Sequence, residues 1–416
     1  MIGLMGMAGL ARPSWIPQAP LAGKPGLLLD FMGQRAFQSG VQVPLANVVT
    51  FSRASSAVDT LPGGSLVTLG SNVPRYGGGL GFTSGPSRTN MMLQSQTFDS
   101  GSWTTAGATV TADATSAPDA TTTADMMTVV ASSGQGRYQV ITVTPATQYT
   151  FSVYVKLGTM PLATATMAFR DDTAGAFIAQ DVAINVGTNA TGWTRTIYTL
   201  TTPAGCTALR VYPLRSNNSS PAAGTAYYWG AQLEAGAFAT AYIATTTATV
   251  TRAADVMKIT GAPLTAAIGA GTAYTWWAEI EATTTGTGLV VLGTANEASP
   301  AFADCAYATV GATGLSVAAI ISGNNSQTSF AAQAGAASPT PTRFSARIAS
   351  ADVATSVGGA AVLTNNIVTL PVTSPTRIAI GSAPWSLGTS NPELLIKRVG
   401  FWPTGLVNSD LQAIAA

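Results

Sequence analysis

Three short segments of this chain carry the residue types that hold a sugar. They are YTFSVYVKL (149–157), ALRVY (208–212) and YYWGAQLE (227–234). A protein binds a pyranose by placing the apolar face of the sugar on a Trp or Tyr ring. Arg, Asn, Gln or Asp side chains then meet the hydroxyl groups. The aromatic, basic and amide residues of these segments therefore point to carbohydrate binding.

Strand parity separates the binding candidates from the core, because successive side chains of a strand point to opposite faces of its sheet. The predicted core residues are Tyr149, Phe151, Val153, Val155, Leu157, Leu209, Val211, Tyr227, Trp229 and Leu233. The predicted outward-facing candidates are Tyr154, Lys156, Arg210, Tyr212, Tyr228 and Gln232. If the three strands are neighbours in one sheet, these candidates form a single platform. The alternative is that the tyrosines pack against another domain or subunit. Trp385, in the loop SAPWSLG, is a further stacking candidate.

Catalytic chemistry has little support in the sequence. Histidine, the commonest general base and a common metal ligand, is absent. The adjacent acids Asp171 and Asp172 lie in the turn-like RDDTAG, where we expect a structural role. Such a turn could offer oxygen ligands to Ca²⁺, but no calcium-loop spacing accompanies it. No nucleophile elbow or phosphate-binding loop is present, so we expect a non-enzyme without a cofactor.

Composition and charge limit the partners. The 416 residues are 46% hydrophobic and only 9% charged, with a formal net charge of +1. Nucleic acid and anionic membranes are therefore poor partners, and no run approaches the roughly 20 apolar residues of a membrane span. Cys206 and Cys305 fall in different predicted domains and show no metal-ligand spacing, so we expect two buried thiols without a disulfide.

The distribution of turn residues and short alternating strands divides the chain into four stretches. Residues 1–48, rich in Pro and Gly, are expected to form an extended anchoring arm with one strand in LLLDF, and 49–95 a connecting segment of short strands. Residues 96–246 and 247–416 each repeat short alternating strands between turns. The predicted fold class is all-β, with two antiparallel β-sandwich domains of jelly-roll or concanavalin-like type.

Several segments resemble a known family. FSRASSA (51–57), NVPRYG (72–77) and SRTNMMLQS (87–95) are similar, in order and spacing, to the FTRAS…VPRFD…RTNLLLYS signature of bacteriophage structural proteins. In that family the signature precedes a carbohydrate-binding-like sandwich, which 96–246 resembles, and residues 227–255 carry a further match. The end of the chain, 396–416, is similar to the last strand and short terminal helix of concanavalin-like (laminin-G type) sandwiches, with Leu411 and Ile414 facing the core.

The resemblance implies a virion structural protein of a tailed phage or a phage-like particle such as a gene transfer agent. The expected component is a tail fibre, tail spike or head fibre, made in the host cytoplasm and displayed on the particle surface. The arm would bind other virion proteins, and the sandwiches would adhere to host surface polysaccharide. A homo-oligomer is implied, a trimer in fibres or a pentamer at a capsid vertex.

Three alternatives stay open at this stage. One is a capsid or tail decoration and assembly protein with no glycan ligand. Another is a polysaccharide-degrading spike whose paired carboxylates come from separate strands. A bacterial surface adhesin would need an export signal, and the N-terminus lacks the basic region of one.

Overall fold

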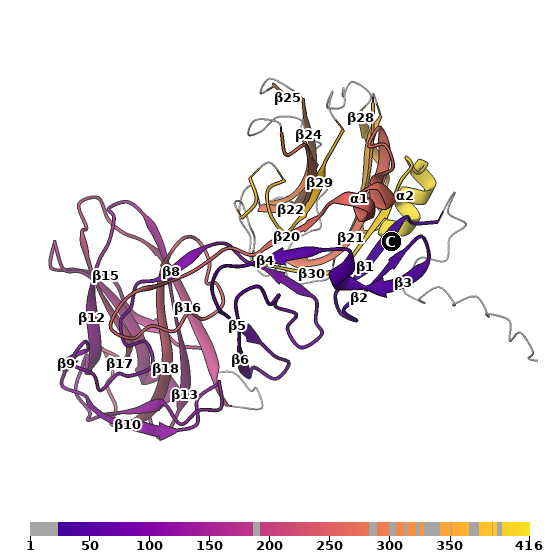
Figure 1. Ribbon diagram of the computed structural model, residues 1–416. Helices are drawn as coiled ribbons and strands as arrows, with labels where there is room; N and C mark the ends of the chain where they lie inside the picture. The colour runs from indigo at the N-terminus through magenta and orange to yellow at the C-terminus, as the bar shows by residue number, and fades with distance from the viewer. Residues whose placement is uncertain are drawn as a thin grey trace, which may run out of the picture. The chain divides into compact units, whose positions relative to one another are not determined.

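Antiparallel β-sheets make up most of the protein, which confirms the predicted all-β fold class (Figure 1). A computed structural model describes the residue ranges 24–185, 192–282, 289–298, 305–311, 314–321, 325–327, 342–350, 352–365, 374–384, 386–388 and 393–416. The chain divides into two compact units. Unit 1 comprises 1–52, 79–84 and 255–416, and unit 2 comprises 53–78 and 85–254.

Unit 2 is built on two five-stranded sheets. The first, here the β18 sheet, has the order β10 (Thr109–Thr115), β11 (Ala124–Val129), β18 (Gly224–Ala235), β13 (Gln148–Leu157) and β16 (Thr194–Thr201). The second, here the β17 sheet, has the order β15 (Ala176–Ala183), β14 (Ala165–Asp171), β17 (Ala208–Ser216), β12 (Gly136–Thr142) and β9 (Thr104–Ala106). A short 3-10 helix, η2 (Leu162–Thr164), precedes β14.

One apolar core joins the two sheets. Phe151 of β13 meets Phe169 of β14 edge to face at 5.6 Å between ring centroids, and Phe169 stacks on Tyr198 of β16 at 5.0 Å. Leu209 and Val211 of β17 enter the same core fully buried. Strand parity therefore placed the inward faces of β13 and β17 correctly, because neither strand is interrupted there.

A β-bulge at Gly230 reverses the predicted parity of the first half of β18. The pairing of β18 with β13 slips by one residue between Ser152 and Tyr154, and Gly230 has a positive φ of 69°. Beyond such a bulge, alternate side chains exchange faces. Tyr228 therefore enters the core, where its ring stacks on Phe98 at 3.9 Å. The predictions that Tyr228 faces outward and that Tyr227 and Trp229 face inward are wrong.

Unit 2 also contains two small sheets formed by its flanking segments. The strand β5 (Ala57–Thr60) pairs with β6 (Leu66–Leu69), and β8 (Arg88–Asn90) pairs with β19 (Val250–Arg252). The β5–β6 hairpin contributes Leu66 and Val58 to a second apolar cluster, which includes Trp229. The segments before and after the main sandwich are thus part of its packing.

Unit 1 contains a nine-stranded and a seven-stranded sheet. The first has the order β28 (Leu363–Asn365), β27 (Val353–Val357), β26 (Thr342–Ala349), β21 (Ala273–Ala282), β30 (Leu394–Trp402), β1 (Leu27–Asp30), β2 (Arg35–Gln38) and β3 (Val41–Pro44), with β7 (Phe82–Ser84) also paired to β30. The second has the order β25 (Asn325–Gln327), β24 (Gly314–Ile321), β23 (Cys305–Gly311), β22 (Leu289–Ala295), β29 (Arg377–Ile380), β20 (Val256–Ile259) and β4 (Thr50–Ser52). The helices are η1 (Leu45–Asn47), α1 (Gly261–Ile268) and α2 (Asn408–Ala415).

Residues 27–44 do not form the extended arm expected for 1–48. β1 pairs with β30 along its whole length, from Leu27 opposite Phe401 to Asp30 opposite Arg398, so the start of the described chain lies beside its end (Figure 1). Leu27 and Leu29 are fully buried. These apolar side chains gain more by completing a sheet than by lying along the surface. The strand predicted in LLLDF is present, and residues 1–23 lie outside the described residues.

The predicted connecting segment 49–95 is shared between both units. β4 and β7 belong to sheets of unit 1, whereas β5, β6 and β8 belong to unit 2. The observed units therefore interleave along the sequence, unlike the four consecutive stretches predicted. Cys206 and Cys305, which belong to different units, are buried thiols outside any disulfide. Leu411 and Ile414 of α2 are buried as well.

The bulge gives a direct test of how β18 is built. A Cβ at Gly230 would lie 3.2 Å from the Tyr154 ring and 3.3 Å from the Tyr242 ring, whereas Gly205, at φ 88°, has open space around it. Both Gly→Ala changes incur the left-handed backbone cost of about 1–2 kcal/mol. We expect G205A to lower the free energy of unfolding by about 1 kcal/mol and G230A by about 2–3 kcal/mol. Denaturant unfolding measures both, and equal losses would contradict the predicted crowding.

Candidate functional site

The sequence-predicted candidates lie on two different sheets. Tyr154 and Lys156 of β13 and Gln232 of β18 point away from the core on the β18 sheet, whereas Arg210 and Tyr212 of β17 point away from it on the β17 sheet. Tyr228 is in the core between them, and Trp385 lies outside the described residues. The predicted single platform is therefore wrong, because β17 does not neighbour β13 or β18 within a sheet.

Over β13 and β18, the outer face of the β18 sheet is covered by the protein's own chain. Tyr154 is only 7% exposed, and its ring meets Trp229 edge to face at 5.7 Å. Trp229 packs against Tyr242 at 4.7 Å, and its indole donates to the Thr123 hydroxyl at 3.0 Å. Leu66 of the β5–β6 hairpin completes the cluster. These aromatic rings hold covering loops in place and present no surface to a sugar.

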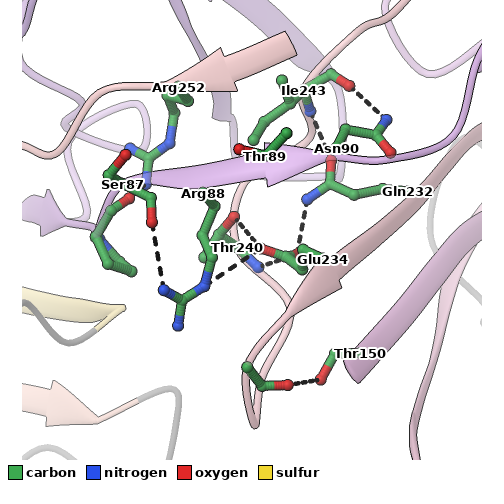
Figure 2. A network of polar contacts seen from close by, with 12 residues as sticks. Ser87, Arg88, Thr89, Asn90, Thr150, Gln232, Glu234, Thr240, Ile243 and Arg252 are labelled. Carbon is green, nitrogen blue, oxygen red and sulfur yellow. Dashed lines mark hydrogen bonds and ion pairs between the residues drawn. The ribbon is translucent and has the colours of Figure 1, made fainter. Parts of the chain in front are cut away.

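Gln232 is likewise used internally, in the polar network of Figure 2. Its amide nitrogen donates to Glu234 at 2.7 Å, and its carbonyl oxygen accepts the Ile243 amide at 2.7 Å. Glu234, fully buried, also accepts the amide and the hydroxyl of Thr240, each at 2.8 Å, and its carboxylate lies 3.7 Å from Arg88. A buried carboxylate needs such partners. The network fastens the 236–243 loop over the sheet.

Asn90 of β8 joins this network through Ile243, whose backbone bonds both Asn90 and Gln232, as Figure 2 shows. Its amide nitrogen donates to the carbonyls of Ala231 and Ile243 at 3.0 and 2.8 Å. Its amide oxygen accepts the amides of Met92 and Leu233 at 3.0 and 3.2 Å. One buried side chain thus ties three separate backbone segments together.

The arginines of the signature segments are structural too. Arg53 is 1% exposed and donates to the carbonyls of Ser55, Gly70 and Val73 at 2.9–3.0 Å. Arg252 is buried and donates to the Pro86 carbonyl at 2.6 Å. A guanidinium has five donors in a fixed fork, which suits the joining of several loop carbonyls. These motif residues therefore account for the fold and offer no ligand site.

The outer face of the β17 sheet carries a stacked aromatic and guanidinium group, here the Tyr138–Arg210 site. Arg210 lies over the Tyr138 ring of β12, 4.2 Å from its centroid, and the Tyr138 and Tyr212 rings are 5.0 Å apart. Arg210 donates twice to the carboxylate of Asp172, at 2.9 and 2.7 Å. Burial lowers the pKa of Arg210, but hydrogen bonds to Tyr212 and Asp172 outweigh it and raise the pKa, so the guanidinium stays charged.

Exposed apolar side chains flank this site. Val140 lies directly opposite Arg210 across β12 and β17 and is 47% exposed. Phe177 of β15 is 41% exposed, and the buried Arg215 guanidinium lies 5.5 Å from its ring and 5.3 Å from that of Tyr212. Rings, guanidiniums and aliphatic groups thus alternate over neighbouring strands. This combination suits the mixed apolar and hydroxyl surface of a sugar.

A groove of about 420 Å³ adjoins the site along β12. Its walls are formed by Met91, Leu93, Ser102, Gln139, Val140, Ile141, Thr142 and Thr249. The Gln139 side chain accepts the Leu93 amide at 3.0 Å and donates to the Leu93 carbonyl at 2.6 Å, so these two lining residues are held together. Val140 belongs to both the groove and the Tyr138–Arg210 site, so the two are continuous.

The acidic residues near the site have structural partners. The Asp171 carboxylate accepts the amides of Thr173 and Ala174 at 2.9 and 3.0 Å, which accords with the turn role expected for this residue. The hydrogen bond from Ala174 is the main reason that the pKa of Asp171 is lowered. Asp172, also expected to be structural, bridges Arg170 and Arg210 through its two carboxylate oxygens. Within the described ranges, no group of three or more His, Cys, Asp and Glu residues could hold a metal ion.

Sequence reasoning found Arg210 and Tyr212 but missed Tyr138, Val140 and Phe177. The alternation in GRYQVIT (136–142) carried a usable signal, since Tyr138 and Val140 alternate with the inward-facing Ile141. What was missing was the pairing of β12 with β17. No helix of the described chain is long and apolar enough to cross a membrane.

Comparisons with known proteins give only distant likenesses. No family model and no curated protein matches the chain. The CBM40 module of the Ruminococcus gnavus IT-sialidase, solved with α2,3-sialyllactose, is 11% identical over 35% of this chain and 84% of its own, with a TM-score of 0.31. The enzymatically active domain of tailspike protein 4 of bacteriophage CBA120 is 18% identical over 35% and 21%, with a TM-score of 0.28. The CBM22 tandem of Paenibacillus barcinonensis Xyn10C is 13% identical over 75% and 97%, with a TM-score of 0.28.

The network around Asn90 predicts a purely structural role for the signature strand β8. N90A would leave four buried backbone groups without a partner, and we expect it to lower the free energy of unfolding by about 3–5 kcal/mol. Thr89, the preceding residue, is half-buried and shares one hydroxyl contact with Thr251, so T89A should cost less than about 0.5 kcal/mol. Denaturant unfolding compares the two, and similar losses would contradict the role given to Asn90.

Proposed function

We propose that this protein is a virion structural component that adheres to host surface polysaccharide through the Tyr138–Arg210 site. The component would be a tail fibre, tail spike or head fibre of a tailed phage or a gene-transfer-agent-like particle. The virion part rests on the signature resemblance of 51–95 and 227–255. The glycan part rests on one observation, the Arg210 guanidinium stacked on Tyr138 and bonded to Asp172 on a sheet face flanked by exposed apolar groups.

The site is suited to weak binding of a glycan chain. Sugars would contact Val140 and the half-buried ring of Tyr138, whereas Tyr212, only 7% exposed, offers them little surface. The groove along β12 would take the neighbouring sugars. A homo-oligomer displayed in many copies on a particle surface would convert weak single-site affinity into firm adhesion by effective concentration. The N-terminal segment would bind other virion proteins and so attach the chain to the particle.

Binding without catalysis is favoured because the carboxylates at the site are already hydrogen-bonded to other groups of the protein. A glycosidase needs a free acid and base on either side of the scissile bond. Here Asp172 is engaged by two arginines and Asp171 by a turn. We therefore propose a non-enzyme. Release of reducing ends from host polysaccharide, abolished by a single Asp or Glu change, would instead establish a degrading spike.

The two sheet faces make opposite predictions for glycan binding. Y138A, which removes the ring under Arg210, should weaken binding to surface polysaccharides of the host by about three- to tenfold. K156A, on the covered face of the β18 sheet, should leave it unchanged. Glycan-array and calorimetric titration of the full chain measure both. Loss of binding in K156A alone would move the site to the other face, and no binding by the wild type would favour an assembly protein.

The virion role has a separate test. Antibodies raised against the full chain should label the surface of particles released by the strain that carries the gene, in immunogold electron microscopy. Labelling at a tail tip would indicate a fibre or spike, and labelling at capsid vertices would indicate a head fibre. Purified particles that lack the chain would contradict the proposal whatever the glycan data show.

A further inference from the structure

Two arginines stand directly opposite each other at the Tyr138–Arg210 site. Arg170 of β14 and Arg210 of β17 are register partners, so their side chains share one face of the sheet. Like charges in such a cross-strand pair repel each other and destabilise the sheet unless something compensates. The pair therefore requires negative charge nearby.

Asp172 supplies only half of the compensation. One carboxylate oxygen accepts Nη1 of Arg170 at 2.6 Å, and the other accepts Nε and Nη2 of Arg210 at 2.9 and 2.7 Å. Two guanidiniums thus share a single carboxylate, which leaves one positive charge in excess. The carboxylate is also the better covered partner, since the Asp172 side chain is 14% exposed against 27% and 23% for Arg170 and Arg210.

Both guanidiniums keep N–H groups for a ligand. Of its five donors, Arg170 gives one to Asp172 and one to the Gly175 carbonyl at 3.1 Å. Arg210 directs two at a single oxygen of Asp172 and makes a further hydrogen bond with Tyr212, which still leaves two donors. Asp172, by contrast, already accepts three donors and has little capacity left for sugar hydroxyls. The site is thus rich in donors and poor in acceptors.

We infer that the glycan bound at this site is anionic, with a sugar carboxylate held by the Arg170–Arg210 pair. This inference rests on the proposed function and narrows it to acidic polysaccharides. Guanidinium matches carboxylate in geometry and forms charge-assisted hydrogen bonds with it. The positive charge is local, because the whole chain carries a net charge of only +1 and 9% charged residues.

The first experiment changes the ligand and leaves the protein intact. Each acidic polysaccharide that the full chain binds on a panel containing polygalacturonate, hyaluronan, alginate and host capsule is titrated beside its carboxyl-reduced, neutral form. We expect reduction of the carboxyl groups to weaken binding at least about fivefold, and a rise from about 0.05 M to about 0.5 M NaCl to weaken binding of the acidic form alone.

The second experiment changes the shared carboxylate of Asp172. Removing its negative charge should change the affinity for acidic and for neutral glycans in opposite directions. D172N frees both guanidiniums and should tighten binding of an acidic glycan by about two- to fivefold, whereas R170Q should weaken it by a similar factor. E297Q and K258Q each replace one member of an exposed ion pair in unit 1. They match the charge changes of D172N and R170Q and should leave glycan affinity unchanged. Melting temperatures confirm that each variant is folded.

The outcomes separate this inference from the proposed function. Tighter binding by D172N together with loss on carboxyl reduction supports an anionic ligand. Equal binding of native and reduced polysaccharide, or weaker binding by folded D172N, overturns the inference and leaves glycan binding in place. If D172N does not fold, the ligand comparison with the wild type decides alone. Binding to no acidic glycan of the panel overturns the inference, and binding to no glycan of the array as well overturns the proposed function with it.

Discussion

The β-bulge at Gly230 is the constraint on which unit 2 depends. By adding one residue to β18 in the left-handed conformation, it sends Tyr228 into the core and turns Trp229 to the outer face. Trp229 then forms an aromatic cluster with Tyr154 and Tyr242, and an apolar cluster on a sheet face must be covered. The hairpin β5–β6 and the 236–243 loop provide the cover. On the outer face of the β17 sheet, by contrast, Val140 and Phe177 stay 47% and 41% exposed, so a ligand can reach this face.

Buried polar groups make this cover specific. Asn90, Glu234 and Arg53 each satisfy several backbone or side-chain partners, and each would be costly if one partner were removed. Apolar packing alone would tolerate several loop positions, whereas directional hydrogen bonds select one. The signature segments supply Arg53 and Asn90 to this arrangement. Their positions therefore say little about the ligand.

The β17 sheet uses its polar groups differently. There the side chains of Arg170 and Arg210 are 27% and 23% exposed and share one carboxylate, and the aromatic rings stack with guanidiniums in place of filling a core. The two arginines of this site repel each other across the strands, which lowers the stability of the sheet. The same pair also keeps donors that no group in the described part of the chain uses. A ligand that binds these donors would explain why a destabilising pair is present, and this is the physical reason to look for function on this face.

The sequence by itself determined the fold class, the inward faces of β13 and β17, the burial of the two thiols and the outward direction of Arg210 and Tyr212. These follow from alternation and composition, which are local properties. Only the tertiary structure decided that β17 lies in a different sheet from β13 and β18, that Gly230 exchanges the faces of Tyr228 and Trp229, and that β1 completes a sheet with β30. Strand pairing joins residues that are far apart along the chain, and a bulge is defined only against its partner strand. For the same reason, Tyr138 and Asp172 could be placed beside Arg210 only after β12, β14 and β17 were seen together.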